Sequence, residues 1–169
     1  MVVESPLGRV LRDADGVRLE FERTYEHPVE DVWAALTEPD GLARWIGTVT
    51  GDPRSGTVEL VMSEDDGAAA EVVSVVECVP PSRLVVDLPS PDGPWRLSVV
   101  LRAEGRLAAL VLTQRLDEPY DAGSIGPGWH YYLDRLGAVV GGRPVPADWD
   151  AYYPALEPHY AVPDAPRRG

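Results

Sequence analysis

The residues of this chain that are best suited to catalysis or metal binding are few and widely spaced. Histidines occur at positions 27, 130 and 159, the single cysteine is Cys78, and Ser124 lies in a glycine-rich stretch. None of these residues shows the short spacing of a metal-binding motif, and no nucleophile motif or phosphate-binding loop is present. The sequence therefore predicts no metal, no cofactor and no catalytic residue.

One histidine has a candidate partner. His130 and Asp134 are four residues apart, so on a helix they share one face and can form a hydrogen bond. We expect an exposed pair here, with a catalytic pair as the less favoured alternative. Cys78 lies in a valine-rich segment, and we expect it to be a small buried apolar residue.

Tryptophan is frequent in this chain, with five residues against a single phenylalanine. An indole ring has a large flat apolar face and one N–H donor, which suits contact with planar or steroid-like molecules. Trp33 fits the apolar stripe of a predicted helix, and we expect it to pack in the core. For Trp45, Trp95 and Trp129, core packing and a role in a ligand pocket both remain open.

The charge balance excludes two classes of partner. The 169 residues carry a formal net charge of −13, and all 15 basic residues are arginines. A surface this acidic repels nucleic acids and anionic membranes. No apolar run approaches the roughly 18 residues of a membrane span, so we expect no membrane insertion and a soluble, cytoplasmic protein. The oligomeric state stays open.

Alternation of apolar and polar residues predicts most of the strands. They are expected at residues 9–12, 17–25, 57–62, 70–79, 83–88, 95–103 and 107–116. Arg23 is the exception on an otherwise apolar strand face: either it reaches solvent near the strand end, or it points into a cavity and pairs with a group there. Residues 71–76 are apolar on both faces, so their inner face is undecided.

Helical spacing predicts a helix that follows Pro28 and a shorter one at residues 42–46. A glycine-rich loop at residues 123–128 then precedes a long helix from Trp129 to Val140. Prolines divide residues 149–160 into two short helical pieces. We expect a single domain over residues 1–169, with 9–160 ordered and 163–169 a frayed tail.

The order of these elements predicts the architecture. One long strand, two short helices, an antiparallel meander of five or six strands and a long C-terminal helix must bury one apolar sheet face. The expected fold is α+β of the helix-grip type: a strongly curved antiparallel sheet wrapped around the long C-terminal helix. Such a sheet favours an internal cavity, and cavities of this kind are the usual ligand sites.

Two segments carry a resemblance to a known family. Residues 27–39, HPVEDVWAALTEP, followed by Leu42-Ala43-Arg44-Trp45, resemble the opening signature of the START-like (SRPBCC) superfamily. More narrowly, they resemble the family related to the C-terminal domain of the activator of the ninety-kilodalton heat-shock protein ATPase. Residues 128–136, GWHYYLDRL, with the following Gly141-Gly142, resemble the last helix of that family. The resemblance implies a helix-grip fold with a hydrophobic pocket.

The same resemblance leaves three functions open, because the superfamily includes ligand binders, polyketide aromatase/cyclases, lipid carriers and a chaperone cofactor domain. We favour a non-catalytic protein that binds or sequesters a small hydrophobic or aromatic molecule. An aromatase/cyclase-like enzyme is the alternative, for which the sequence offers Arg23, His130 and nearby tyrosines as proton-transfer groups. A partner protein resembling a chaperone ATPase activator ranks third.

In a helix-grip fold, the first long strand, the second helix, a central strand and the C-terminal helix can converge on the cavity. The residues that we expect to line it are Phe21, Arg23, Trp45, Trp95, Trp129 and Tyr132. Arg23 is the first candidate to meet an anionic or enolate-like group of a ligand.

Overall fold

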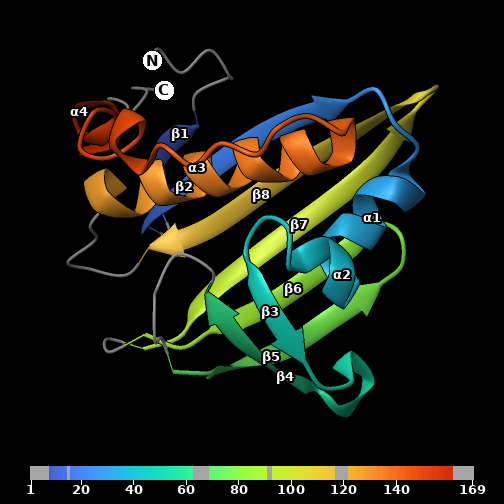
Figure 1. Cartoon of the computed structure of the whole chain (residues 1–169). Helices are drawn as coiled ribbons and strands as arrows, with labels where there is room; N and C mark the ends of the chain where they lie inside the picture. The colour runs from blue at the N-terminus through green and yellow to red at the C-terminus, as the bar shows by residue number, and fades with distance from the viewer. Residues whose placement is uncertain (1–7, 15, 63–68, 91–92, 117–121, 162–169) are drawn as a thin grey trace.

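A curved antiparallel sheet with helices on its inner side makes up the described part of the protein (Figure 1). The computed structural model describes residues 8–14, 16–62, 69–90, 93–116 and 122–161; the predicted tail at 163–169 lies outside them. The elements in chain order are β1 Arg9–Asp13, β2 Gly16–Tyr25, α1 Val29–Thr37, α2 Pro39–Leu42, β3 Gly47–Thr50, η1 Pro53–Ser55, β4 Thr57–Met62, β5 Glu71–Val79, β6 Arg83–Leu88, β7 Trp95–Glu104, β8 Leu107–Leu116, α3 Ala122–Gly141, η2 Trp149–Ala151 and α4 Glu157–Ala161.

The strands of the described residues form one eight-stranded sheet in the order β1-β2-β8-β7-β6-β5-β4-β3. Every neighbouring pair is antiparallel. Strands β3 to β8 are neighbours in sequence order, as hairpin spacing predicts, whereas β2 pairs with the last strand, β8. This pairing places the first long strand beside the last one. The chain then continues from β8 into the long helix α3, which lies on the sheet.

Strand β2 shows how the alternating pattern builds the core. Its inward positions pair directly with those of β8, so that Phe21 lies opposite Leu112 and Arg23 lies opposite Leu110. Phe21, Leu110 and Leu112 are buried in the main hydrophobic cluster. Side chains of directly opposed residues lie on the same sheet face, and Arg23 is therefore on the inner face with them.

A β-bulge in β5 determines which of its residues point inward. The pairing of β5 with β6 shifts register between Val75 and Glu77. Before the bulge, Val73 and Val75 face the inside; after it, the parity changes and Cys78 takes the inner side. The bulge reverses the alternation within the strand, so the pattern of residues 71–76 does not by itself predict that Cys78 faces inward.

Helix α3 lies along the inner side of the sheet and contacts β2 (Figure 1). The prediction that it begins at Trp129 was wrong, because it begins at Ala122 and includes the glycines that were expected to form a loop. Those glycines make room for α4: a Cβ added at Gly126 would lie 2.4 Å from the Tyr160 ring. Packing has overridden the low helix propensity of glycine at this position.

Two shorter elements also differ from expectation. The second helix was predicted at residues 42–46, but α2 spans Pro39–Leu42 and a turn follows it. Proline at the first helical position, Pro39, sets the start of this helix. Strand β3, which was not predicted, consists of only four residues at the sheet edge.

Candidate functional site

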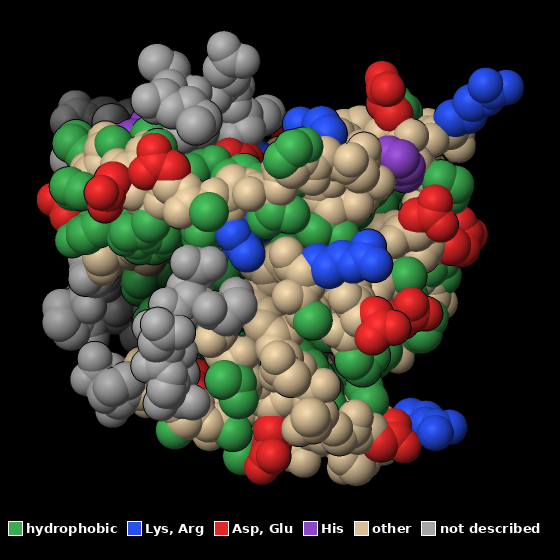
Figure 2. All heavy atoms as spheres, viewed as in Figure 1, with side chains coloured by type: hydrophobic (Ala, Val, Ile, Leu, Met, Phe, Trp, Pro, Cys, Tyr) green, Lys and Arg blue, Asp and Glu red, His purple; other side chains and the backbone are tan. Residues whose placement is uncertain are grey.

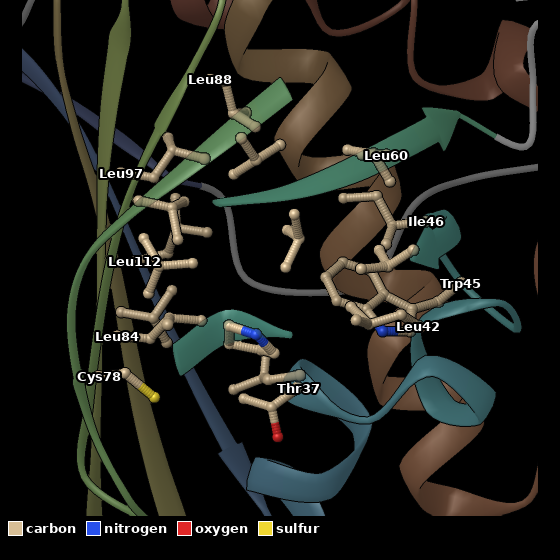
Figure 3. Close-up of a pocket in the computed structure, with 18 of the residues that line it drawn as sticks. Thr37, Leu42, Trp45, Ile46, Leu60, Cys78, Leu84, Leu88, Leu97 and Leu112 are labelled. Atoms are coloured by element: carbon tan, nitrogen blue, oxygen red, sulfur yellow. The ribbon is translucent and has the colours of Figure 1, made fainter. Parts of the chain in front are cut away.

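A pocket of about 160 Å³ lies between the sheet, helices α1 and α2, and helix α3 (Figure 3). We call it the inner pocket. Its wall is almost entirely aliphatic and aromatic, and much of it comes from the inner faces of the four strands β5 to β8. The lining includes Leu36, Thr37, Leu42, Trp45, Ile46, Leu60, Val73, Val75, Cys78, Leu84, Leu88, Leu97, Val99, Leu110, Leu112, Trp129 and Leu133.

The nitrogen and oxygen side-chain atoms of this wall are engaged elsewhere. Trp45 Nε1 donates to the backbone oxygen of Ala35 at 2.8 Å, and Trp129 Nε1 donates to Gln114 Oε1 at 2.6 Å. Thr37 Oγ1 donates to the backbone oxygen of Trp33, one turn earlier in the same helix, at 2.8 Å. The inner pocket therefore presents flat and branched apolar surfaces, with the Cys78 thiol at one side.

A second pocket of about 380 Å³ adjoins the first, and we call it the outer pocket. The two pockets share four lining residues, Ile46, Leu60, Leu88 and Trp129. The outer pocket is more polar, because its wall also includes Glu71, Ser90 and Ser124. Two of its aromatic side chains are Trp95, from the start of β7, and Tyr132, from α3.

The structure brings four of the six expected cavity residues to these pockets. Trp45 lines the inner pocket, Trp95 and Tyr132 line the outer one, and Trp129 lines both. Phe21 and Arg23 lie on the same sheet face but are not among the lining residues of either pocket. The role of the four in ligand binding stays a prediction.

Arg23 belongs instead to a buried polar cluster between β2 and α3. Its side chain is 6% exposed, and Nη2 lies 3.7 Å from Asp134 Oδ1. Arg23 Nη1 donates to the backbone oxygen of Glu22 at 3.0 Å, while Nε and Nη2 have no hydrogen-bond partner within the described residues. Of the two alternatives for Arg23, the structure shows the buried pair rather than the solvent-exposed side chain.

A chain of hydrogen bonds beside this pair runs from Gly8, the residue before β1, to α3. The Gly8 N–H donates to the Tyr160 hydroxyl oxygen at 2.9 Å, and that oxygen lies 2.9 Å from His130 Nδ1. Which of the two donates depends on the imidazole tautomer, and the other ring nitrogen, Nε2, lies 3.8 Å from Asp134 Oδ2. Asp134 also accepts a hydrogen bond from the Tyr152 hydroxyl at 2.6 Å.

Burial sets the protonation state of this cluster. His130 is wholly buried, so the expectation of an exposed His130–Asp134 pair was wrong. Desolvation lowers the pKa of His130 to about 4, although the nearby Asp134 carboxylate opposes the shift. His130 is therefore neutral near neutral pH, and it lines neither pocket.

Several residues of the site were missed by the sequence analysis. Cys78 is exposed at one side yet also lines the inner pocket, so the expectation of a buried thiol was wrong. Arg135 Nε donates to the backbone oxygen of Trp45 at 2.9 Å and ties α3 to the segment after α2. Alternation in β7 and β8 could have identified Leu97, Val99, Leu110 and Leu112, whereas no pattern marks Gln114 as the partner of Trp129.

Charged side chains lie mostly outside the pockets. Acidic groups are spread in small sets over one face of the molecule, with arginines among them (Figure 2). Across β6 and β7, the Arg96 guanidinium donates to both oxygens of Asp87 at 2.8 and 2.9 Å, which lowers the pKa of that carboxyl. In the part of the chain that is described, no group of three or more His, Cys, Asp or Glu could hold a metal ion. Nor is any helix there both long and apolar enough to cross a membrane.

A sequence model of the family described as activator of Hsp90 ATPase homolog 1-like protein matches residues 26–141. The chain belongs to this family. The expected START-like superfamily is thereby confirmed, as is the helix-grip fold with its curved antiparallel sheet and C-terminal helix. The matched range begins before α1 and ends with α3, so it includes most of the walls of both pockets.

Solved structures support the same fold for this family member. CalU16 from Micromonospora echinospora shares 23% identity over 91% of this chain and 93% of its own, with a TM-score of 0.71. EF2215 from Enterococcus faecalis, a conserved protein of unknown function, shares 20% over 90% and 87%, with a TM-score of 0.70. DynU16, from the dynemicin biosynthetic locus, shares 18% over 78% of this chain and 50% of its own, with a TM-score of 0.67. No curated protein matches the chain.

Proposed function

We propose that this protein binds a small hydrophobic or aromatic molecule in the inner pocket and does so without catalysing its conversion. The observation that carries the proposal is an apolar pocket of about 160 Å³ whose wall nitrogens and oxygens are already hydrogen bonded within the protein. A buried cavity of about 150 Å³ with a similar aliphatic and aromatic wall binds benzene in another protein. Membership of a START-like family is further support.

The absence of turnover is supported by the chemistry of the wall. Among the described lining residues of the inner pocket there is no carboxylate, imidazole, guanidinium or amine, and the proton-transfer group there is the Cys78 thiol. General acid–base catalysis needs a positioned group within hydrogen-bond reach of each proton that moves, and one thiol does not provide an acid and a base together. Arg23 and His130, which the aromatase/cyclase alternative would use, pair with Asp134 and Tyr160 outside the pockets.

Two neighbouring valines in β7 provide a matched test. Val99 is buried and lines the inner pocket, whereas the next residue, Val100, is exposed. Val99→Phe puts a phenyl ring into the pocket, and Val100→Phe adds the same ring outside it. We expect Val99→Phe to weaken binding of phenylbutanol at least about tenfold, since losing contact with two methylene groups costs about 1.6 kcal/mol. Val100→Phe should bind normally in calorimetric titrations.

Cys78 supplies a second, independent measurement. It is the chain's single cysteine and lines the inner pocket, so alkylation by N-ethylmaleimide reports on one site. Bound phenylbutanol should slow this alkylation in the folded protein and leave it unchanged in urea. Folded Val99→Phe protein that binds normally, with no protection of Cys78, would show that the inner pocket is not the site. Chemical change of the recovered phenylbutanol would contradict the absence of catalysis.

A further inference from the structure

The two pockets differ in the kind of ligand group that each can accommodate. The inner pocket offers apolar contacts, and its volume of about 160 Å³ matches a benzene ring or a short alkyl chain. The outer pocket is larger, at about 380 Å³, and adds hydroxyls and a carboxylate to its aromatic walls. Both pockets share Trp129 and three aliphatic side chains, so they are neighbours, and an elongated molecule has the shape that would reach both.

The charge of the outer pocket has a definite sign. Glu71, at the start of β5, contributes a carboxylate, and the described lining residues include no arginine or histidine. The net charge of −13 adds a repulsive background for any anion that approaches. Among the described residues of its wall, a carboxylate or phosphate placed in this pocket would meet one acidic side chain and no basic one.

We propose that one amphipathic molecule spans both pockets, with its apolar end in the inner pocket and a neutral or cationic polar end in the outer pocket. Anionic ligands, such as fatty acids, are selected against by Glu71. The inference rests on the proposed function and adds to it the ligand's orientation and the charge of its polar end. Ser90 and Ser124 provide hydroxyls beside that end, and Trp95 provides a flat face.

The test uses three probes that share a phenyl ring and a chain of four carbons, counting the carboxyl carbon, but differ in the polar end. They are phenylbutanol, phenylbutylamine and phenylbutyrate, titrated calorimetrically near neutral pH at low salt. We expect phenylbutyrate to bind about five- to tenfold more weakly than the other two, because its carboxylate meets one repulsive charge at close range. High salt should reduce the difference.

Glu71→Gln should raise the affinity for phenylbutyrate, lower that for phenylbutylamine and leave phenylbutanol unchanged. Glu59→Gln is the control, because it makes the same change in net charge at an exposed residue that lines neither pocket. Val99→Phe should weaken all three probes by a similar factor, because their phenyl end is common. These results together would support the two-pocket arrangement.

Other outcomes separate the two proposals. Phenylbutyrate that binds as tightly as phenylbutanol would overturn the charge selection while leaving the proposed function standing. Sensitivity to Glu71→Gln without sensitivity to Val99→Phe would place the ligand in the outer pocket alone, which overturns the spanning arrangement and the inner pocket as the binding site. If no probe binds and none protects Cys78, both the inference and the proposed function fail.

Discussion

The indole N–H of Trp129 donates a hydrogen bond to Gln114 Oε1 at 2.6 Å, across the buried interface between α3 and β8. Gln114 is wholly buried, and its Nε2 has no hydrogen-bond partner within the described residues. The bond fixes the edge of an indole ring that forms part of the walls of both pockets. Gln114 thus positions a pocket residue without lining either pocket.

The Trp129–Gln114 bond should be visible as a coupling free energy. We expect the destabilisation by Gln114→Leu and Trp129→Phe together to be smaller than the sum of the single effects, by about 1 kcal/mol or more. Each single change leaves a buried polar group without its partner, and the double change removes both groups. Urea denaturation followed by circular dichroism measures the four proteins. A cycle of Gln114→Leu with the exposed Trp149→Phe should be additive.

His130 should make stability depend on pH. In the unfolded chain its pKa is near 6.5, and in the folded protein it is about 4. Between these values the unfolded state binds the proton and the folded state does not, so the free energy of unfolding falls as pH decreases through this window. The expected slope from this residue is about 1.4 kcal/mol per pH unit in the middle of the window, with no contribution above it.

The variant His130→Gln isolates this contribution. Its free energy of unfolding, measured by urea denaturation between pH 4 and 7, should vary less with pH than that of the parent protein. Equal slopes for the parent and His130→Gln would mean that the imidazole is not kept neutral by burial.

Close packing of α4 on α3 predicts opposite effects of the same substitution at two glycines. A Cβ at Gly126 would lie 2.4 Å from the Tyr160 ring, whereas the nearest atom to a Cβ at Gly137 is a Tyr25 ring carbon at 3.5 Å. Gly126→Ala should lower the unfolding free energy by about 1–3 kcal/mol through overpacking. Gly137→Ala should be neutral or stabilising by up to about 1 kcal/mol. Thermal and urea denaturation of the pair decide this.

Arg23 should contribute to stability and not to ligand affinity. Arg23→Met leaves the Asp134 carboxylate without its partner guanidinium, and we expect a loss of about 3 kcal/mol in unfolding free energy near neutral pH. Arg23→Met with Asp134→Asn should recover part of this loss, because the buried charge is then removed. Affinity for phenylbutanol should stay within about twofold of that of the parent protein, because Arg23 lines neither pocket and substitutions at separate sites rarely affect each other. A larger loss of affinity would assign Arg23 to the ligand site.

Much of the fold could be predicted because local pattern and tertiary burial agree in most elements. In β2, the alternating residues from Val17 to Tyr25 become the alternating buried positions of the strand. Two exceptions have physical causes that depend on distant residues. Gly126 is helical because Tyr160 packs against it, and Cys78 faces the pocket because β5 bulges against β6. Neither contact can be predicted from the residues next to Gly126 or Cys78 in the sequence.

The site was only partly predictable, for a related reason. Trp45, Trp95, Trp129 and Tyr132 were identified because large aromatic residues in converging elements tend to share a cavity. Arg23 and Phe21 also lie on the inner face of the sheet, but α3 covers that part of it. There His130 contacts Phe21 and Asp134 pairs with Arg23, which leaves no room for a ligand. The part of the sheet face that a ligand can reach depends on where the helix packs. The alternating pattern of a single strand does not predict that position.

Helix α3 has α4 against the side that carries Gly123 and Gly126, while Ser124, Trp129 and Tyr132 face the pockets. The C-terminal segment and the ligand site therefore share one supporting element. Transplanting these pockets into a related scaffold would require moving α3 and α4 as one cassette. In a chimera that exchanged the pocket-facing residues but kept a foreign C-terminal segment, the helix that carries Trp129 would pack at a different distance from the sheet. The indole of Trp129 would then be displaced from the pockets.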